Sequence, residues 1–211
     1  MVTPDRAGSA ERSQPGYVFD FCGGHVALDF VNTVGSRDGD VDEHLGTYGD
    51  LVAWAEARGV VAKAEAGRLR RAAAAAPEDA RAAYRRAIRL REAIYRVFQR
   101  RATGKPPAAD DLATLNRFVA ELYRDAQLVV EGDRVVLETG SAAETLDRPF
   151  APVIRAAVDL LTGDQAPLVG ACADDTCGWL FLDTTRNRTR RWCTMQDCGN
   201  RNKVRRFRSR T

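Results

Sequence analysis

Apolar residues recur every three or four positions through most of the first 160 residues, which is the spacing of amphipathic α-helices. The clearest such pattern covers 78–102 and ends at Gly104. Thr47 and Asp50 form a capping-box pattern, which predicts that a helix over 47–59 begins there. The apolar stripe of the longest helix consists of Ala83, Ala87, Leu90, Ile94, Val97 and Phe98. Further helices are expected over 25–34, over 62–76, from Asp110 or Asp111 onward, and over 148–161.

Other segments follow the two-residue period of β-strands. Residues 128–130 and 135–137 are apolar, and Gly132-Asp133 between them is a turn signal, so we expect a β-hairpin. Aromatic residues alternate with others over 17–21, which predicts a short strand, whereas 35–46 is a polar, acidic loop. We expect 1–15 to be a disordered tail. The whole pattern predicts a mainly α fold of the α+β class, with a helical N-terminal domain over 16–165 that contains one β-hairpin.

Four of the five cysteines form two equally spaced pairs near the C-terminus. Four residues separate Cys172 from Cys177, four separate Cys193 from Cys198, and fifteen lie between the pairs. This spacing suits a tetrahedral Zn²⁺ site of four thiolates. A module of about 40 residues with so little apolar surface also needs a metal in order to fold. The alternatives are two disulfides or four unrelated thiols, although an odd number of cysteines leaves a disulfide framework incomplete.

The residues around the cysteines predict the rest of this module, which we place at 166–211. A linker over 163–170 is expected to lead into it. The spacer is expected to close as a hairpin, with a strand over 179–182, a turn over 185–188 and a return over 189–192. A short basic helix follows, with one apolar edge made by Val204 and Phe207. Knuckle, hairpin, knuckle and helix is the order of a treble-clef zinc finger. The aromatic residues Trp179, Phe181 and Trp192 are expected to form its small core, and Cys22 to be a buried apolar side chain.

The charge of the chain divides at the cysteines. The net charge is +3, but residues 172–211 carry ten basic and four acidic side chains, so this part is +6 and the remainder is −3. A basic module on a mildly acidic body favours a polyanion as the partner of the module, because basic side chains neutralise phosphates. Asn200 and Asn202 could read a base edge, and the alternative for the whole segment is a solvated charged tail. The candidate nucleic-acid contacts are Arg186, Arg188, Arg190, Arg191, Asn200, Arg201, Lys203, Arg205, Arg206, Arg208 and Arg210.

Two motifs resemble known families. The module resembles the CGNR zinc finger, named for the tetrapeptide that stands here as Cys198-Gly199-Asn200-Arg201. The segment 27–33, Ala-Leu-Asp-Phe-Val-Asn-Thr, is similar to the opening motif of the ABATE domain, and Tyr48-x-Asp50-Leu51-x-x-Trp54 also looks like that family. The resemblance implies a helical N-terminal domain followed by a zinc finger, in a family described as stress-induced transcription regulators.

Polar residues inside the apolar stretch near the N-terminus have two interpretations. Asp29, Asn32 and Thr33 are either buried and hydrogen-bonded for structural reasons or, together with Trp54, line a small-molecule pocket. Catalytic candidates are few. A treble-clef nuclease would need a histidine base inside the finger, and the only two histidines of this chain lie outside it. We therefore expect that the protein is not an enzyme.

The sequence thus predicts a zinc-dependent DNA-binding transcription regulator whose N-terminal domain senses a small-molecule effector or a protein partner. RNA is not excluded as the nucleic acid. The alternative is an interaction adaptor whose zinc module docks an acidic protein surface. No apolar run reaches the ~18 residues of a membrane helix, and 1–15 has no apolar signal core, so we expect a cytoplasmic protein without a membrane partner.

Overall fold

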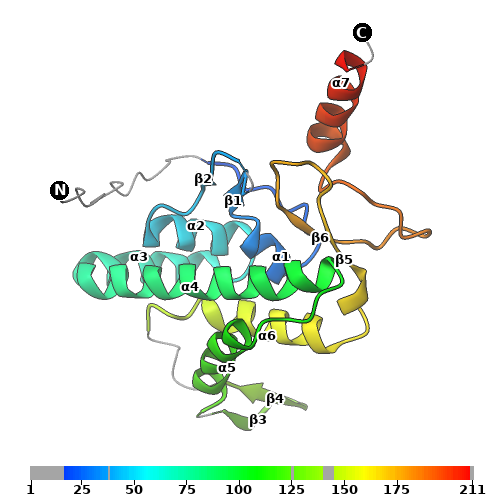
Figure 1. Ribbon diagram of the computed structural model, residues 1–211. Coiled ribbons are helices and arrows are strands. Elements are labelled where there is room, and N and C mark those ends of the chain that lie inside the picture. The colour runs from blue at the N-terminus through cyan, green and yellow to red at the C-terminus, as the bar shows by residue number, and fades with distance from the viewer. Residues whose placement is uncertain (1–16, 38, 125, 140–144, 210–211) are drawn as a thin grey trace, which may run out of the picture.

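Helices α1 to α6 form the body of the protein (Figure 1). The structure, a computed structural model, describes residues 17–37, 39–124, 126–139 and 145–209. The longest helix, α4, runs across the body and contacts each of the other five. All the expected helices of this domain are present: α1 (Val26–Val31), α2 (Tyr48–Ala57), α3 (Lys63–Ala75), α4 (Pro77–Ala102), α5 (Ala109–Tyr123) and α6 (Phe150–Thr162).

Helix α4 packs through its predicted apolar stripe, whose six side chains are all fully buried. Burial of each large aliphatic or aromatic side chain stabilises the fold by roughly 1.5–3 kcal/mol. Arg91 is also buried on this helix, because its guanidinium donates to the carboxylates of Glu43 at 2.7 Å and Glu92 at 2.9 Å. The predicted capping box of α2 is confirmed: the Thr47 hydroxyl accepts from the backbone of Asp50, whose carboxylate accepts from the backbone of Thr47.

The described residues of the N-terminal part form two small sheets. The predicted hairpin is confirmed as β3 (Gln127–Glu131) paired with β4 (Arg134–Glu138). The expected loop over 35–46 instead contains a two-residue ladder between β1 (Val34–Gly35) and β2 (Asp42–Glu43). The two ends of the loop are held together by a backbone hydrogen bond from the His44 N–H to the Thr33 carbonyl and by the ion pair of Arg91 with Glu43, and the ladder forms between them.

The strand expected over 17–21 is wrong, since these residues are irregular. Their aromatic side chains anchor the segment instead of pairing its backbone. The ring of Tyr17 stacks on His44 with centroids 4.2 Å apart, and Phe19 and Phe21 pack against the helical core. The alternating aromatic residues therefore attach this irregular segment to the body through their side chains. The expected tail over 1–15 lies outside the described residues.

The hairpin of the zinc module lies earlier in the chain than expected. Strand β5 (Val169–Ala171) falls partly in the predicted linker and pairs with β6 (Leu180–Leu182), so the first cysteine pair occupies the turn between them. The predicted returning strand over 189–192 is wrong. The buried carboxylate of Asp183 shapes this segment by accepting from the backbone of Thr185 and of Arg190, both at 2.9 Å. These bonds give two backbone N–H groups of the loop an acceptor without a returning strand.

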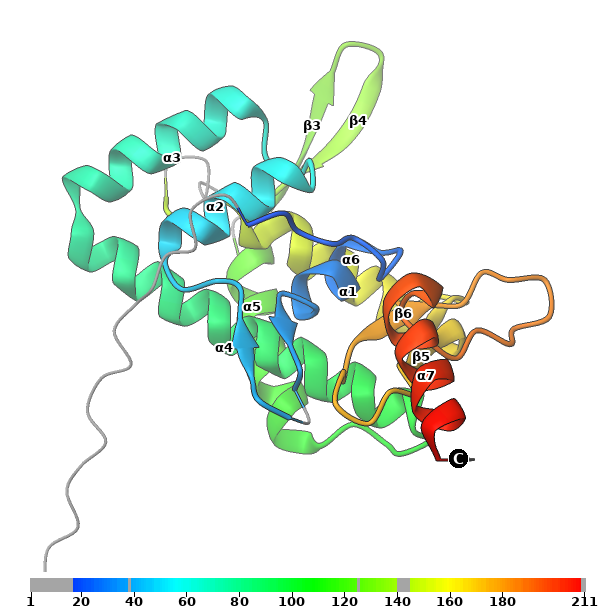
Figure 2. The ribbon, with the colours of Figure 1, turned by 90° about the horizontal axis from the view of Figure 1, so that it is seen from above.

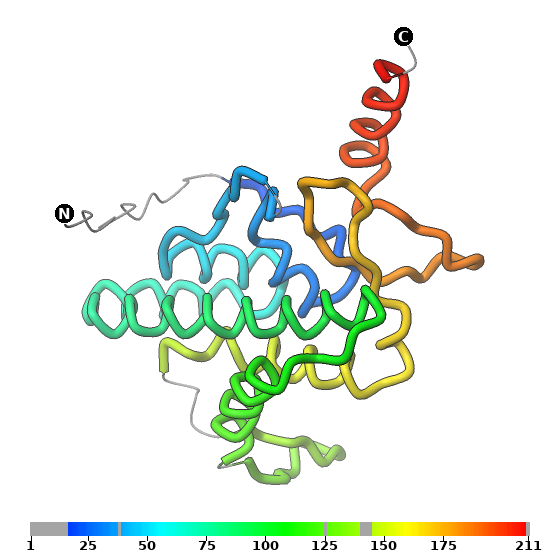
Figure 3. Tube along the Cα trace, viewed as in Figure 1, coloured from blue at the N-terminus to red at the C-terminus, as the bar shows by residue number. Residues whose placement is uncertain are grey.

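The zinc module and the helices share one core. Val169, Leu180 and Leu182 belong to the same buried cluster as the helical stripe, and β5 and β6 contact α4 and α1 (Figure 2). The outer edge of β6 is closed by the N-terminal segment: Asn32 donates to the Leu180 carbonyl at 2.8 Å and accepts from its N–H at 2.9 Å, while the Gly23 carbonyl accepts from Leu182. In Figure 3 the chain then leaves the body along helix α7 (Asn200–Arg208), which projects away from it.

Candidate metal centre and basic surface

The four paired cysteines converge on one point. Cys172 and Cys177 flank the turn between β5 and β6, Cys193 follows the loop after β6, and Cys198 lies in a π-helical turn, Met195–Gly199, that leads into α7. All four sulfurs lie within 4.8 Å of one another, with 3.6 Å from Cys177 to Cys193 and 3.5 Å from Cys193 to Cys198. A tetrahedron with zinc–sulfur bonds of about 2.3 Å separates its sulfurs by about 3.8 Å. The donor set therefore fits Zn²⁺, and the protein binds zinc.

The crowding of these thiols disfavours the ionisation of most of them. Hydrogen bonds from the thiols of Cys177 and Cys193 lower the pKa of Cys172, and the same contacts with Cys172 raise the pKa of both partners. Burial raises the pKa of Cys198. Four thiolates at these distances repel one another, and a divalent cation supplies the charge that lets all of them ionise.

Asp174 is a functional residue that sequence reasoning missed. It lies inside the first cysteine pair, and its side chain is fully buried. Its carboxylate accepts from Asn202 at 2.9 Å and from Arg205 at 2.7 Å, and it pairs with Arg201 at 3.2 Å. It thus joins the first knuckle to the helix that follows the second. The only sequence signal was an acidic residue two positions after a ligating cysteine.

The CGNR tetrapeptide has structural roles here. The Arg201 guanidinium donates to the Cys198 sulfur at 3.0 Å, and such contacts orient metal ligands. A Cβ at Gly199 would meet the Met195 sulfur at 2.8 Å, so glycine allows the tight turn. Asn200 donates to the Gln196 carbonyl at 2.9 Å and is exposed.

Arg190 makes contacts inside the fold, and its role as a nucleic-acid contact stays a prediction. Its guanidinium lies over the Phe181 ring, 4.4 Å from the centroid, and donates to the carbonyls of Leu182, Cys22 and Cys193. It therefore fastens the N-terminal segment to the metal centre. Cys22 is only half-buried and packs against the cysteine cluster. The expected aromatic core is confirmed around the same cluster by Phe181, Trp179 and Trp192.

The remaining basic candidates divide into tethered and exposed groups. Arg201 and Arg205 are exposed by about half, yet both are tied to Asp174. The Arg191 guanidinium lies 5.2 Å from the centroid of the Trp192 ring. Arg210 lies outside the described residues. Six exposed cations have no carboxylate within ion-pair distance among the residues that the structure describes: Arg186, Arg188, Arg191, Lys203, Arg206 and Arg208.

The predicted ligand-binding residues are all buried, and the polar ones hold structure together. Burial raises the pKa of Asp29, although Arg58 opposes this by donating to its carboxylate at 2.6 Å. Asn32 closes the edge of β6, and the hydroxyl of Thr33 donates to the Phe30 carbonyl at 2.7 Å. The Trp54 ring packs at 5.0 Å from that of Phe30, and its indole N–H has no partner among the described residues. A ligand role for these four stays a prediction.

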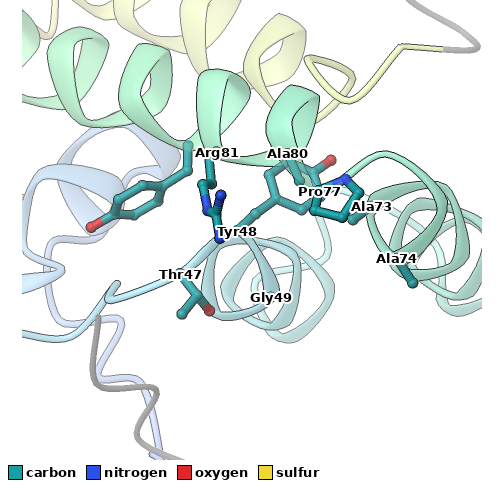
Figure 4. A pocket seen from close by; sticks show the side chains of 9 residues that line it. Thr47, Tyr48, Gly49, Ala73, Ala74, Pro77, Ala80 and Arg81 are labelled. Atoms are coloured by element: carbon teal, nitrogen blue, oxygen red, sulfur yellow. The ribbon is translucent and has the colours of Figure 1, made fainter. Parts of the chain in front are cut away.

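Cavities lie elsewhere on the helical domain. One of about 280 Å³ opens between the start of α2 and the junction of α3 with α4 (Figure 4). Among the described residues that line it, Arg81 is the single charged side chain, and it is paired with Glu78. Another, of about 350 Å³, lies beside β1 and α4 and is lined by the Arg37–Glu92 and Arg91–Glu43 pairs. None of the four predicted residues lines either cavity.

Fold and site together define a helical protein with a four-thiolate zinc finger at its C-terminal end. A family model described as "Putative stress-induced transcription regulator", ABATE, matches residues 24–164, and the CGNR zinc finger model matches 169–211. The chain belongs to the ABATE family and carries a CGNR zinc finger, as the two motifs indicate. No curated protein matches it. Within the described part of the chain, no helix is long and apolar enough to cross a membrane.

Proposed function

We propose that this protein is a zinc-dependent transcription regulator that binds DNA through the exposed cations of its finger. The observation that carries the proposal is that the basic side chains over 186–208 fall into two groups, one bonded inside the fold and one exposed. Some are used inside the fold, as Arg190 is, whereas six remain exposed without a carboxylate partner in the described chain. Cations held on a rigid scaffold neutralise phosphates at little entropic cost and release counterions. Exposed basic side chains without a carboxylate partner are the ones that a phosphate backbone would use.

The chain's own residues would present these cations in two groups. Lys203, Arg206 and Arg208 lie on α7, which Asp174 ties to the first knuckle through Arg205. Arg186, Arg188 and Arg191 lie on the loop between β6 and Cys193, which projects from the same module in Figure 1. When bound, zinc joins the two cysteine pairs and so fixes both groups on one module. DNA would have to contact both groups for the full affinity.

Direct bonds connect the finger to the helical domain, which would transmit the binding of an effector or protein partner. The Trp179 indole donates to the Val34 carbonyl at 2.6 Å, and the backbone of Arg37 donates to Cys177 at 3.3 Å. Val34 and Arg37 flank the cavity beside α4. A molecule that displaced this segment would therefore change contacts of the zinc knuckle itself. No enzymatic step is part of this proposal.

The test is a salt titration of binding. Zinc-loaded full chain is titrated into a fluorescently labelled duplex of mixed sequence, and anisotropy gives Kd at several salt concentrations. If all six exposed cations contact phosphates, log K should fall against log salt with a slope of about −5. Single-stranded RNA of the same length tests the other nucleic acid. If neither the duplex nor the single-stranded RNA binds at low salt, the proposal is overturned.

A second candidate is the protein-docking adaptor, and the surface of α7 favours it. Val204 is 49% exposed and Phe207 is 74% exposed, so the predicted apolar edge faces solvent beside Lys203 and Arg206. An amphipathic helix of this kind also suits an acidic protein groove. Binding that persists at high salt and that generic DNA does not compete for would support the adaptor.

A further inference from the structure

The buried carboxylate of Asp174 uses its two oxygens for two different parts of the finger. Its Oδ1 atom accepts from the backbone N–H of Thr176 at 3.2 Å and from the Thr176 hydroxyl at 3.0 Å, so this oxygen belongs to the first knuckle. Its Oδ2 atom lies 3.2 Å from the Arg201 guanidinium and accepts from Asn202 at 2.9 Å and from Arg205 at 2.7 Å. Arg201 and Arg205 are four positions apart and therefore share one face of α7. One side of the helix thus converges on a single oxygen.

Helix α7 buries no side chain of its own. It projects from the body in Figures 1 and 3, and Asn202 is half-buried while its other residues are exposed. Within the described chain, the side-chain hydrogen bonds and ion pairs that reach beyond the preceding turn go to Asp174, apart from a pair of Arg205 with the exposed Asp175 at 3.6 Å. Asp174 is therefore the main attachment of α7 to the rest of the finger.

A helix of this size does not persist in water without such an attachment. Isolated helices shorter than about 12–15 residues are marginal, and most helical stability in proteins comes from the packing of an apolar face. Helix α7 has nine residues and buries no such face. Hydrogen bonds to an ionised carboxylate are about twice as strong as those between neutral groups. The bonds to Asp174 therefore take the place that packing has in other helices.

We propose that Asp174 is a positioning residue that keeps α7 folded and fixed to the first knuckle. The helix then holds Lys203, Arg206 and Arg208 on one module with the arginines of the loop between β6 and Cys193. Without the carboxylate, DNA would have to order α7 as it binds, and that ordering costs affinity. The consequence for DNA binding rests on the proposed function, whereas the order of α7 does not.

The negative charge of Asp174 makes the expected effect on DNA binding distinctive. Asp174→Asn adds one positive charge to the finger and removes the anionic partner that Arg201 and Arg205 share. If the carboxylate acted through its charge alone, this variant would bind DNA more tightly than the unchanged chain. Positioning predicts the opposite sign: the affinity for a duplex should fall by about fivefold or more, although the finger has become more basic.

Hydrogen exchange of the zinc-loaded full chain tests the order of α7 directly. Exchange of the backbone amides over 200–208, followed by mass spectrometry, should be about tenfold faster in Asp174→Asn than in the unchanged chain, because the helix opens more often. The matched control is Asp175→Asn, which makes the same change of charge in the same knuckle at a side chain that is 86% exposed. The control should exchange like the unchanged chain and should bind DNA no more weakly. Both variants should keep one zinc per chain, since no ligand is altered.

A second pair of variants decides the question if Asp174→Asn loses zinc. Arg205→Gln and Arg206→Gln remove the same charge from adjacent positions of α7, and of the two only Arg205 bonds to Asp174. Exchange over 200–208 should be faster in Arg205→Gln and unchanged in Arg206→Gln.

Two results would overturn the proposal. One is equal exchange in the aspartate variant and its Asp175 control, or in the two arginine variants. The other is tighter DNA binding by a zinc-loaded Asp174→Asn chain. If the unchanged chain binds no nucleic acid while loss of the carboxylate still speeds exchange over 200–208, the proposed function fails and the role of Asp174 in α7 is confirmed.

Discussion

Replacement of Asn32 by Leu tests the claim that the zinc module is built into the helical body. The Asn32 side chain forms both hydrogen bonds of the outer edge of β6 at Leu180, at 2.8 and 2.9 Å, and all these groups are buried. Leucine has a similar volume but leaves the N–H and the carbonyl of Leu180 without partners. Each buried orphan group costs about 1–3 kcal/mol, so we expect the free energy of unfolding to fall by about 3 kcal/mol.

Urea unfolding of the zinc-loaded chain, followed by tryptophan fluorescence, measures this loss. Asn116→Leu on the exposed surface of α5 is the matched control and should change stability by less than about 0.5 kcal/mol. The zinc content of the Asn32 variant should remain one per chain, because no ligand is altered. A change as small as that of the control would refute the reasoning that this side chain joins the two parts.

Three further predictions follow from the same contacts. Cys193→Ser should abolish stoichiometric zinc by elemental analysis and should melt the module, because metal binding and folding are coupled. A chain that ends at residue 165 should keep a cooperative urea transition but lose several kcal/mol of stability, since it lacks Val169, Leu180 and Leu182 of the shared core. Burial opposes ionisation of Glu92, but Arg37 and Arg91 outweigh burial and lower the pKa of this carboxyl below its ordinary value of 4.5. The ionised Glu92 therefore stabilises the folded protein fully above pH 4.5, and this stabilisation is lost as the pH falls through the lower pKa of the folded state. The urea midpoint of Glu92→Gln should therefore converge on that of the unchanged chain in acid, and a constant difference would contradict this.

The helices and the metal ligands could be predicted from the sequence because both are local signals. The stripe of α4 repeats over several turns, and two equal cysteine gaps constrain the geometry of a metal site. The same logic located β3–β4, where a turn signal separates two apolar runs. It failed for β5, which pairs across the first cysteine pair and has little alternation of its own.

The division among the arginines could not be predicted, because their partners are distant in sequence. Arg190 reaches the carbonyl of Cys22, 168 positions away, and Arg205 reaches Asp174 across 31 positions. Arg206 beside it has the same residue type and the same local composition. Only the fold decides which guanidinium is used internally. For the same reason Asn32 was open to a ligand role in the sequence, and in the structure it pairs with Leu180.

The most direct test of the central claim compares DNA affinity when equal numbers of exposed cations are removed from two places. The finger variant combines Lys203→Ala, Arg206→Ala and Arg208→Ala on α7, and the control combines alanine at Arg68, Arg71 and Arg85 on α3 and α4. Both lose three charges. We predict that the finger variant binds every duplex more weakly, with its salt slope reduced in magnitude by about 3, while the control binds like the unchanged protein. Equal affinities for the finger variant and the unchanged chain, or equal losses in the two variants, would contradict the account.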